Sequence, residues 1–189
     1  MEGDNEANIE LSKDKKSYID IPEADFVEDV DSFMAQREND GSVDKALKKF
    51  DENHSKYKLM EYNLVNKRKR LKAQILELER SLEMIEKLQT EKDNSHDLET
   101  QFLLSEQVFV KAIVPPTEKV GLWLGANVML EYSLDDAQEF LIKNIEAAKR
   151  NLGYVEHDLD FVRDQFTTIE VNMARVYNWG VKRRQAVLM

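Results

Sequence analysis

The residues of this sequence that most often do chemistry are three histidines and a large set of carboxylates. His54, His96 and His157 could act as metal ligands or bases, but no HExxH or related ligand spacing joins them. Acidic pairs are plentiful, yet highly charged helices always supply such pairs, and nothing singles one out as an acid–base dyad. The sequence therefore predicts no metal site and no catalytic residue.

Other frequent types of reactive site lack their residues. The chain contains no cysteine, which excludes disulfides, thiolate nucleophiles and cysteine-bound metal clusters. It also contains no GxxxxGK[ST] segment, so we expect no phosphate-cradling loop for a nucleotide. We therefore expect a protein that is not an enzyme and needs no cofactor.

One basic cluster, Lys67 to Arg70 with Lys72, could contact nucleic acid, which would give a strongly salt-dependent affinity. On a helix these side chains point in several directions, so a solvated face is the better interpretation. The net charge of −10 lies mostly in residues 1–40, which hold 13 acidic and 4 basic side chains. We therefore expect neither nucleic acid nor a membrane as a partner.

The expected location is the cytoplasm. The first residues lack the apolar segment of a secretory signal, and no run approaches the roughly 18 apolar residues of a membrane span. Lys182-Arg183-Arg184 could serve as a weak nuclear address, although a charged helix end is the commoner explanation.

An aromatic and aliphatic cluster, which we call the tip, is the best candidate for binding another molecule. Its candidate contact residues are Leu47, Phe50, Tyr177, Trp179 and Val181. Leu47 and Phe50 can equally close a helix seam, whereas Tyr177 and Trp179 lie off the strict repeat. Large apolar side chains left exposed usually mark an interaction site.

Two long heptad patterns must position the tip. The first spans 42–94, about 75 Å of helix, begins at a plausible N-cap, Ser42, and is interrupted by His54, Glu61 and Arg68. Its repeat is Val43, Leu47, Phe50, His54, Tyr57, Glu61, Leu64, Arg68, Leu71, Ile75, Leu78, Leu82 and Ile85. The second spans 133–184 and is apolar throughout, in the order Leu141, Ile145, Ala148, Leu152, Val155, Leu159, Val162, Phe166, Ile169, Met173 and Val176. Both patterns are typical of coiled coils.

Residues 97–132, between these helices, favour two small β-hairpins. Short β-branched and aromatic runs are separated there by Pro115-Pro116-Thr117 and by Gly125-Ala126-Asn127. Trp123 could stack on a ligand, but a core or inter-subunit position fits its apolar neighbours better. Both faces of the sheet need cover, so we expect assembly with further chains through Val108, Val110, Ile113, Val120, Leu122, Trp123, Leu124, Val128 and Leu130.

The remaining segments are an acidic tail over 1–20, expected to be disordered, a short amphipathic helix over 21–38 and a C-terminal tail over 185–189. Because fewer than forty residues join two helices of similar length, the helices should fold back on each other. The predicted fold class is mainly α: a long antiparallel coiled-coil hairpin with two small β-hairpins at one end.

This order of elements resembles an α-type prefoldin subunit, in which two hairpins separate the arms. The resemblance covers roughly residues 21–184 and is carried by three long strings: IPEADFVEDVDSFM at 21–34, VPPTEKVGLWLGANVMLEYSLDDA at 114–137 and DLDFVRDQFTTIEVNMARVYNWGVKRR at 158–184. It implies a heterohexamer with one further α-type and four β-type subunits, whose hairpins form a double β-barrel platform.

The resemblance also implies a function. Prefoldin captures unfolded polypeptides, notably nascent actin and tubulin, at the coil tips and passes them to a cytosolic chaperonin without nucleotide. The alternative from another class is a structural coiled-coil scaffold or tether, in which the sheet serves only as an oligomerisation clasp. A scaffold would not delay the aggregation of a denatured protein.

Overall fold

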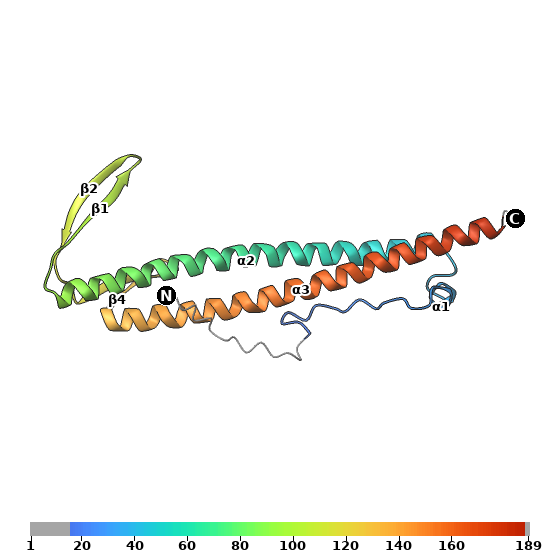
Figure 1. Cartoon of the computed structure of the whole chain (residues 1–189), viewed down its shortest axis with the longest axis horizontal. Helices are drawn as coiled ribbons and strands as arrows, with labels where there is room; N and C mark the ends of the chain where they lie inside the picture. Colours follow the sequence, from blue (N-terminus) through green and yellow to red (C-terminus); the bar gives the residue numbers. More distant parts are fainter. Residues whose placement is uncertain (1–15, 188–189) are drawn as a thin grey trace, which may run out of the picture. The chain divides into compact units, whose positions relative to one another are not determined.

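The computed structural model describes residues 16–187, which form three helices and four strands (Figure 1). In chain order these are α1 (Val30–Ala35), α2 (Val43–Asp93), β1 (Leu98–Ser105), β2 (Val108–Val114), β3 (Lys119–Gly125), β4 (Val128–Ser133) and α3 (Leu134–Val187). The predicted fold class is confirmed, because two long antiparallel helices flank two β-hairpins.

The chain divides into two compact units. The terminal unit combines the chain up to Arg70 with the chain from Leu152 onward, and the hairpin unit comprises Leu71–Asn151. Each unit contains one segment of α2 and one segment of α3. Within each unit these two segments run antiparallel. We describe each unit by itself.

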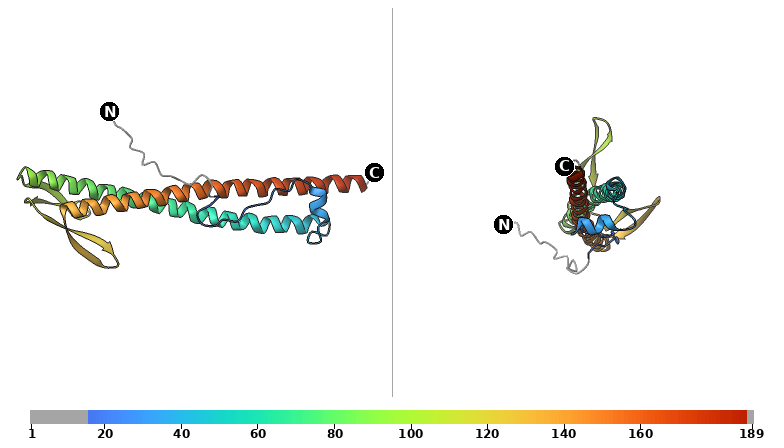
Figure 2. Two further views of the ribbon diagram at one scale, coloured as in Figure 1. Left: turned by 90° about the horizontal axis from the view of Figure 1, so that it is seen from below. Right: turned by 90° about the vertical axis from the view of Figure 1, so that its right-hand side faces the viewer.

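The seam of the terminal unit follows the predicted heptads. Within this unit, α2 and α3 lie side by side in all three ribbon views (Figures 1 and 2). Its buried apolar side chains include Ala46, Phe50, Tyr57 and Leu64 of α2 and Val155, Leu159, Val162, Ile169 and Val176 of α3. Burial of this stripe is the main force that pairs the two helices.

Two of the three polar residues in the α2 repeat have partners on α3. The His54 ring packs on Phe166 with ring centroids 4.2 Å apart, and its Nε2 lies 3.7 Å from Oε1 of Glu170. Glu61 accepts a hydrogen bond from Nε of Arg163 at 3.5 Å. These side chains are half-buried, so the seam accommodates them at its edge.

The hairpin unit has its own apolar core. Ile85, Leu134, Ala137 and Leu141 are buried, and Leu78, Leu82, Leu88, Val120, Leu122 and Tyr132 pack against them. Helix α3 begins with a side-chain cap. The Ser133 hydroxyl accepts a hydrogen bond from the Asp136 amide at 3.1 Å and donates one to the Asp136 carboxylate at 2.6 Å.

Strands β1 and β2 form one antiparallel two-stranded sheet, and β3 and β4 form another. The β3–β4 turn places Ala126 and Asn127 at positive φ, 47° and 61°, the conformation of a type I′ hairpin turn. Gly125, with φ of 86°, lies where the β3–β4 register shifts, as expected for a glycine that permits a bulge.

The segment before α2 differs from its prediction. A helix was expected over 21–38, but α1 covers only Val30–Ala35 and starts at the N-cap Asp29. Residues 21–27 have no regular secondary structure. Main-chain groups of Pro22, Ala24, Asp25 and Val27 instead bond to side chains of α2 and α3. Tertiary contacts have here overridden a local helical pattern.

The chain ends also differ from expectation where they are described. Of the tail expected to be disordered, residues 1–15 lie outside the described part, but Ser17 is buried and Tyr18 stacks on Tyr154 with ring centroids 4.2 Å apart. At the other end, α3 continues past 184 to Val187.

Candidate functional site

The hairpin β3–β4 has one face that the helices partly cover and one open face. Val120, Leu122 and Tyr132 pack against the helical core of the hairpin unit. On the opposite face Trp123 pairs across the strands with Met129, and these side chains are 61% and 58% exposed. A tryptophan and a methionine side by side on an open sheet face suit contact with another chain.

The hairpin β1–β2 exposes large apolar side chains on both of its faces. Phe102 pairs with Val110 on one face and Leu103 pairs with Phe109 on the other, and all four are exposed. Two-stranded sheets of this kind are marginal in water on their own. Its open edges and apolar faces therefore suit pairing with strands of a further subunit.

The predicted assembly residues fall into two groups. Val120 and Leu122 are half-buried against the helices. The exposed members are Val108, Val110, Ile113, Trp123, Leu124, Val128 and Leu130. The structure thus leaves seven of the nine available for contacts with another chain.

Three of the predicted tip residues, Leu47, Tyr177 and Trp179, line one cleft in the terminal unit, and the five differ in accessibility. Phe50 is buried and stacks on Phe33 of α1, with ring centroids 5.5 Å apart. Leu47 and Val181 are half-buried. Tyr177 is 55% exposed and is the most open of the five.

The Trp179 side chain is held in place by contacts at both its ring nitrogen and its ring face. Its Nε1 donates a hydrogen bond to Oδ1 of Asp31 at 2.6 Å, and the guanidinium of Arg183 lies 5.0 Å from its ring centroid. Beside it, Val43, Leu47 and Tyr177 line a cleft of about 690 Å³. The lining also includes the charged residues Asp40, Asp44, Arg183 and Arg184.

Gly180 brings the two helices close together beside this cleft. A Cβ atom added at Gly180 would lie 2.8 Å from Cγ2 of Val43, nearer than side chains normally approach. A side chain larger than hydrogen at position 180 would therefore push the two helices apart beside the cleft.

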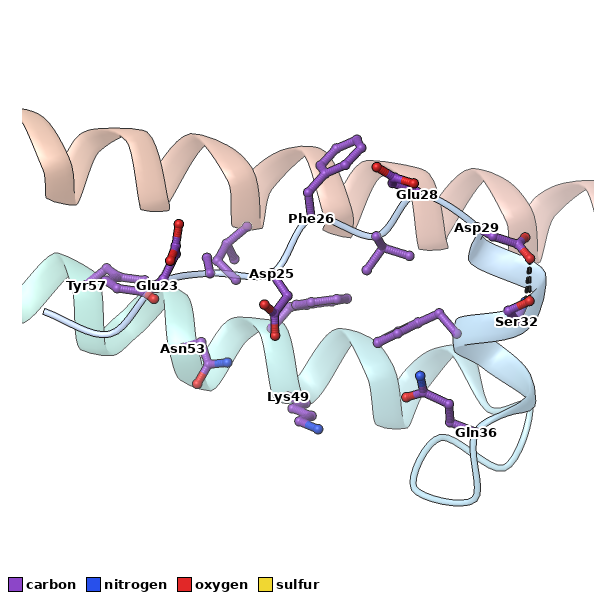
Figure 3. Close-up of a pocket in the computed structure, with 15 residues that line it drawn as sticks. Glu23, Asp25, Phe26, Glu28, Asp29, Ser32, Gln36, Lys49, Asn53 and Tyr57 are labelled. Atoms are coloured by element: carbon purple, nitrogen blue, oxygen red, sulfur yellow. Dashed lines mark hydrogen bonds between the residues drawn. The ribbon is translucent and has the colours of Figure 1, made fainter. Parts of the chain in front are cut away.

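A further feature was missed by the sequence analysis: residues 16–29, which we call the strap, run along the terminal unit between α2 and α3 (Figures 2 and 3). Ser17, Ile21 and Val27 are its buried members, whereas Glu23, Asp25, Phe26 and Glu28 are exposed. The ring of Phe26 lies on the α3 side, 5.2 Å from the guanidinium of Arg175.

Four α3 residues spaced by seven hold the strap and the start of α1, and we call them the strap row. They are Asp158, Gln165, Asn172 and Trp179. Oδ1 of Asp158 accepts from the Tyr18 amide at 2.6 Å, and Oε1 of Gln165 accepts from the Ala24 amide at 2.9 Å. Asn172 bonds twice, as acceptor from the Val27 amide at 2.9 Å and as donor to the Asp25 carbonyl at 2.8 Å.

The spacing of the row matches the geometry of the strap. Seven helical residues advance by about 10.5 Å, and three extended residues span about 10 Å. Gln165 and Asn172, which are seven residues apart, can therefore bond to Ala24 and Val27, which are three residues apart. Asp158, Gln165 and Asn172 are 1%, 6% and 0% exposed. Buried polar groups need partners, and the strap's main chain supplies them.

Tyr57 of α2 fastens the strap from the other side. Its hydroxyl donates a hydrogen bond to the Pro22 carbonyl at 2.8 Å. Burial, followed by the negative charges of Asp25 and Glu23, raises the pKa of the Tyr57 phenol above its ordinary value of 10.0. The neutral, donating form is therefore favoured in the folded chain.

Alkaline pH should loosen this contact. Because the folded-state pKa is raised, the contribution of Tyr57 is complete below pH 10 and is lost only as the pH rises through the higher folded value. The difference between the tyrosinate absorbance titrations of wild type and Tyr57→Phe should show one group with a midpoint above 10. A midpoint at or below 10 would contradict the proposed burial of this phenol beside acidic groups.

Comparison with known proteins decides the family. The Prefoldin subunit family profile matches residues 57–179. Prefoldin subunit 3 of Mus musculus is 57% identical over 170 residues, which cover 90% of this chain and 86% of the mouse protein. Prefoldin subunit 3 of Drosophila melanogaster is 57% identical over 176 residues, covering 93% and 89%, and that of Saccharomyces cerevisiae is 37% identical over 180 residues, covering 90% and 89%.

The chain belongs to the prefoldin family. Prefoldin subunits are non-enzymatic components of a co-chaperone and act together with other prefoldin subunits. The family therefore agrees with the absence of an assigned catalytic residue, and it makes the open hairpin faces the first surfaces to consider for contacts between subunits.

Within residues 16–187, no group of three or more His, Asp or Glu side chains is arranged to hold a metal ion. No helix in that range is both long enough and apolar enough to cross a membrane.

Proposed function

We propose that this prefoldin subunit occupies one of two α-type positions in a heterohexamer with four β-type subunits. The observation that carries this assignment is the set of exposed apolar side chains on both hairpins, since a two-hairpin subunit offers two sheets for pairing. The hairpins of all six subunits form a double β-barrel platform. The complex works in the cytoplasm, and neither nucleic acid nor a membrane is among its partners.

The second part of the proposal is capture of unfolded polypeptides, including nascent actin and tubulin, at the tip, followed by transfer to the cytosolic chaperonin without nucleotide. Exposed Tyr177 and the cleft beside it, lined by Val43 and Leu47, support this role. Several tips tethered to one platform bind by avidity, because the first contact raises the effective concentration of the others. Weak single contacts also permit release.

Replacing Tyr177 and Trp179 by serine should weaken the holding of a denatured protein by the assembled complex while leaving assembly intact. Tyr177 presents open apolar surface and Trp179 borders the same cleft, so the change removes aromatic contact area that is worth roughly 2 kcal/mol or more at a binding hot spot. The measurement is suppression of light scattering by denatured actin diluted into buffer with the complex.

The matched control is Tyr62→Ser, because Tyr62 is a 65% exposed aromatic residue of α2 outside the tip. Since Trp179 also anchors Asp31, the single change Tyr177→Ser separates client contact from anchoring. Unchanged suppression of actin aggregation by both tip variants would refute the role of the tip.

A structural scaffold is the competing function, and the burial of Phe50 beneath α1 favours it, because part of the tip is closed. The same scattering assay separates the two functions. A chaperone complex delays aggregation at near-equimolar amounts without nucleotide, whereas a scaffold leaves the aggregation time of actin unchanged.

A further inference from the structure

The contacts that hold the strap are directed at main-chain atoms. The amides of Tyr18, Ala24 and Val27 donate to the strap row, and the carbonyls of Pro22, Asp25 and Glu28 accept from Tyr57, Asn172 and Arg175. Any extended polypeptide carries the same amides and carbonyls, except for the missing amide of proline. These hydrogen bonds therefore suit an extended chain whatever its side chains are.

Side-chain contacts add to these hydrogen bonds at a few positions, since Tyr18 stacks on Tyr154 and Phe26 lies over Arg175. Ile21 and Val27 are the buried apolar members of the strap, while the side chains between them at Pro22, Glu23 and Asp25 are exposed. Backbone pairing with a few apolar anchors is the general way in which proteins bind extended peptides of varied sequence.

The strap also leaves part of its groove empty. A cleft of about 490 Å³ lies alongside residues 23–29 and is lined on the helix side by Lys49, Phe50, Asn53, Tyr57 and Ile169 (Figure 3). Asp25 points toward the α2 side of this cleft. Phe50 and Ile169 contribute apolar surface to its lining. A bound segment with a larger apolar side chain at this point would find room that the strap does not use.

We propose that the groove between α2 and α3 binds an extended segment of an unfolded polypeptide through Asp158, Gln165, Asn172 and Tyr57. The strap occupies the same groove in the free chain and competes with that segment. This inference rests on the proposed client-binding function and places a second contact beyond the tip cleft. Because the strap is tethered to the same chain, its effective concentration at the groove is high, on the order of millimolar for a short flexible link. A client segment must displace it to bind.

Weakening the strap without altering the groove should therefore tighten client binding. Proline at 24 and 27 removes the two amides that donate to Gln165 and Asn172 and leaves those side chains in place. With the full hexamer and fluorescently labelled, reduced and carboxymethylated α-lactalbumin as a permanently unfolded probe, anisotropy titration of Ala24→Pro/Val27→Pro should give a Kd about threefold to tenfold lower than wild type. The control is Glu23→Pro, whose substituted amide makes none of the strap contacts, and it should bind like wild type.

Variants that alter the groove should change the Kd for the probe in the opposite direction. Gln165→Ala/Asn172→Ala also frees the strap but removes the groups that would hold a client's main chain, so the Kd should rise severalfold. Asn178→Ala, an exposed asparagine of the same helix, should change nothing. If both double variants tighten binding, or if the proline pair leaves the Kd at its wild-type value, the groove is not a client site.

Hydrogen–deuterium exchange on the unmodified hexamer provides a test that needs no variant. The amides of Tyr18, Ala24 and Val27 should exchange at least severalfold faster once the probe is bound, because the strap has left the row. Exchange that stays unchanged or slows would overturn displacement. A wild-type complex that fails to bind the probe would refute the proposed function itself, whereas binding without any response of the strap refutes only the groove.

Discussion

Replacing Leu159 by alanine should lower the free energy of unfolding of the terminal unit by about 2–5 kcal/mol. Leu159 is 1% exposed in the seam, among the most buried large side chains of the described chain. Truncation removes its apolar contacts and leaves a cavity that two packed helices cannot fully close. Urea denaturation of the full chain, followed by helical circular dichroism, measures the change.

Leu59→Ala is the matched control for this prediction. Leu59 lies on α2 with 61% of its surface exposed, so the same chemical change there should stay within about 0.5 kcal/mol. Equal losses at the two positions would mean that the α2–α3 seam is not the main source of stability in the terminal unit.

Replacing Trp123 and Met129 together by serine should disrupt assembly with the other prefoldin subunits. The two side chains form a cross-strand pair on the open face of β3–β4. An aromatic anchor at the centre of an interface contributes about 2 kcal/mol or more, which is roughly a 30-fold change in dissociation constant. Sedimentation velocity of the co-expressed subunits over a concentration series would show free subunit at concentrations where wild type is fully assembled.

The pair can be lost without affecting the core of the hairpin unit, because Val120, Leu122 and Tyr132 lie on the other face. Tyr62→Ser serves as the control, since it removes an exposed aromatic side chain from α2 without touching a hairpin. If the Trp123/Met129 variant assembles at wild-type concentrations, the open face of β3–β4 is not a subunit interface.

The two long helices and both hairpins could be predicted from the sequence because their signals are periodic and local. A heptad repeat fixes which face of α3 is buried, and Leu141, Leu159 and Val176 are all buried as expected. The caps at Ser42 and Ser133 were predictable for the same reason, since capping depends on residues three positions away.

The strap could not be found in this way, because its partners are far away in the sequence. The Val27 amide bonds to Asn172 across 145 residues, and no periodicity within 16–29 reports that contact. A signal did exist on the other side, where Asp158, Gln165 and Asn172 repeat every seven residues immediately before the seam positions Leu159, Phe166 and Met173. A polar row beside an apolar seam is also the ordinary pattern of a solvated coiled coil, so the row alone does not identify the strap.

The sequence pattern predicted the tip as one cluster, but it did not predict that the tip residues would differ in their contacts and exposure. Spacing alone grouped Phe50, Tyr177 and Trp179, whereas the structure gives each a different role. Phe50 is covered by Phe33, Trp179 is held by Asp31, and Tyr177 remains open. That division depends on α1, whose position against the two long helices is a tertiary property.

Photo-cross-linking from the tip of the assembled complex tests the central proposal most directly. A benzophenone amino acid is placed at 177 in one preparation, at 123 in a second and at the exposed α2 position 62 in a third, and each complex is loaded with denatured actin before irradiation and mass spectrometry. We expect actin adducts at position 177, adducts to a neighbouring subunit at position 123, and little of either at position 62. Actin adducts at position 62 that equal or exceed those at position 177 would contradict client capture at the tip.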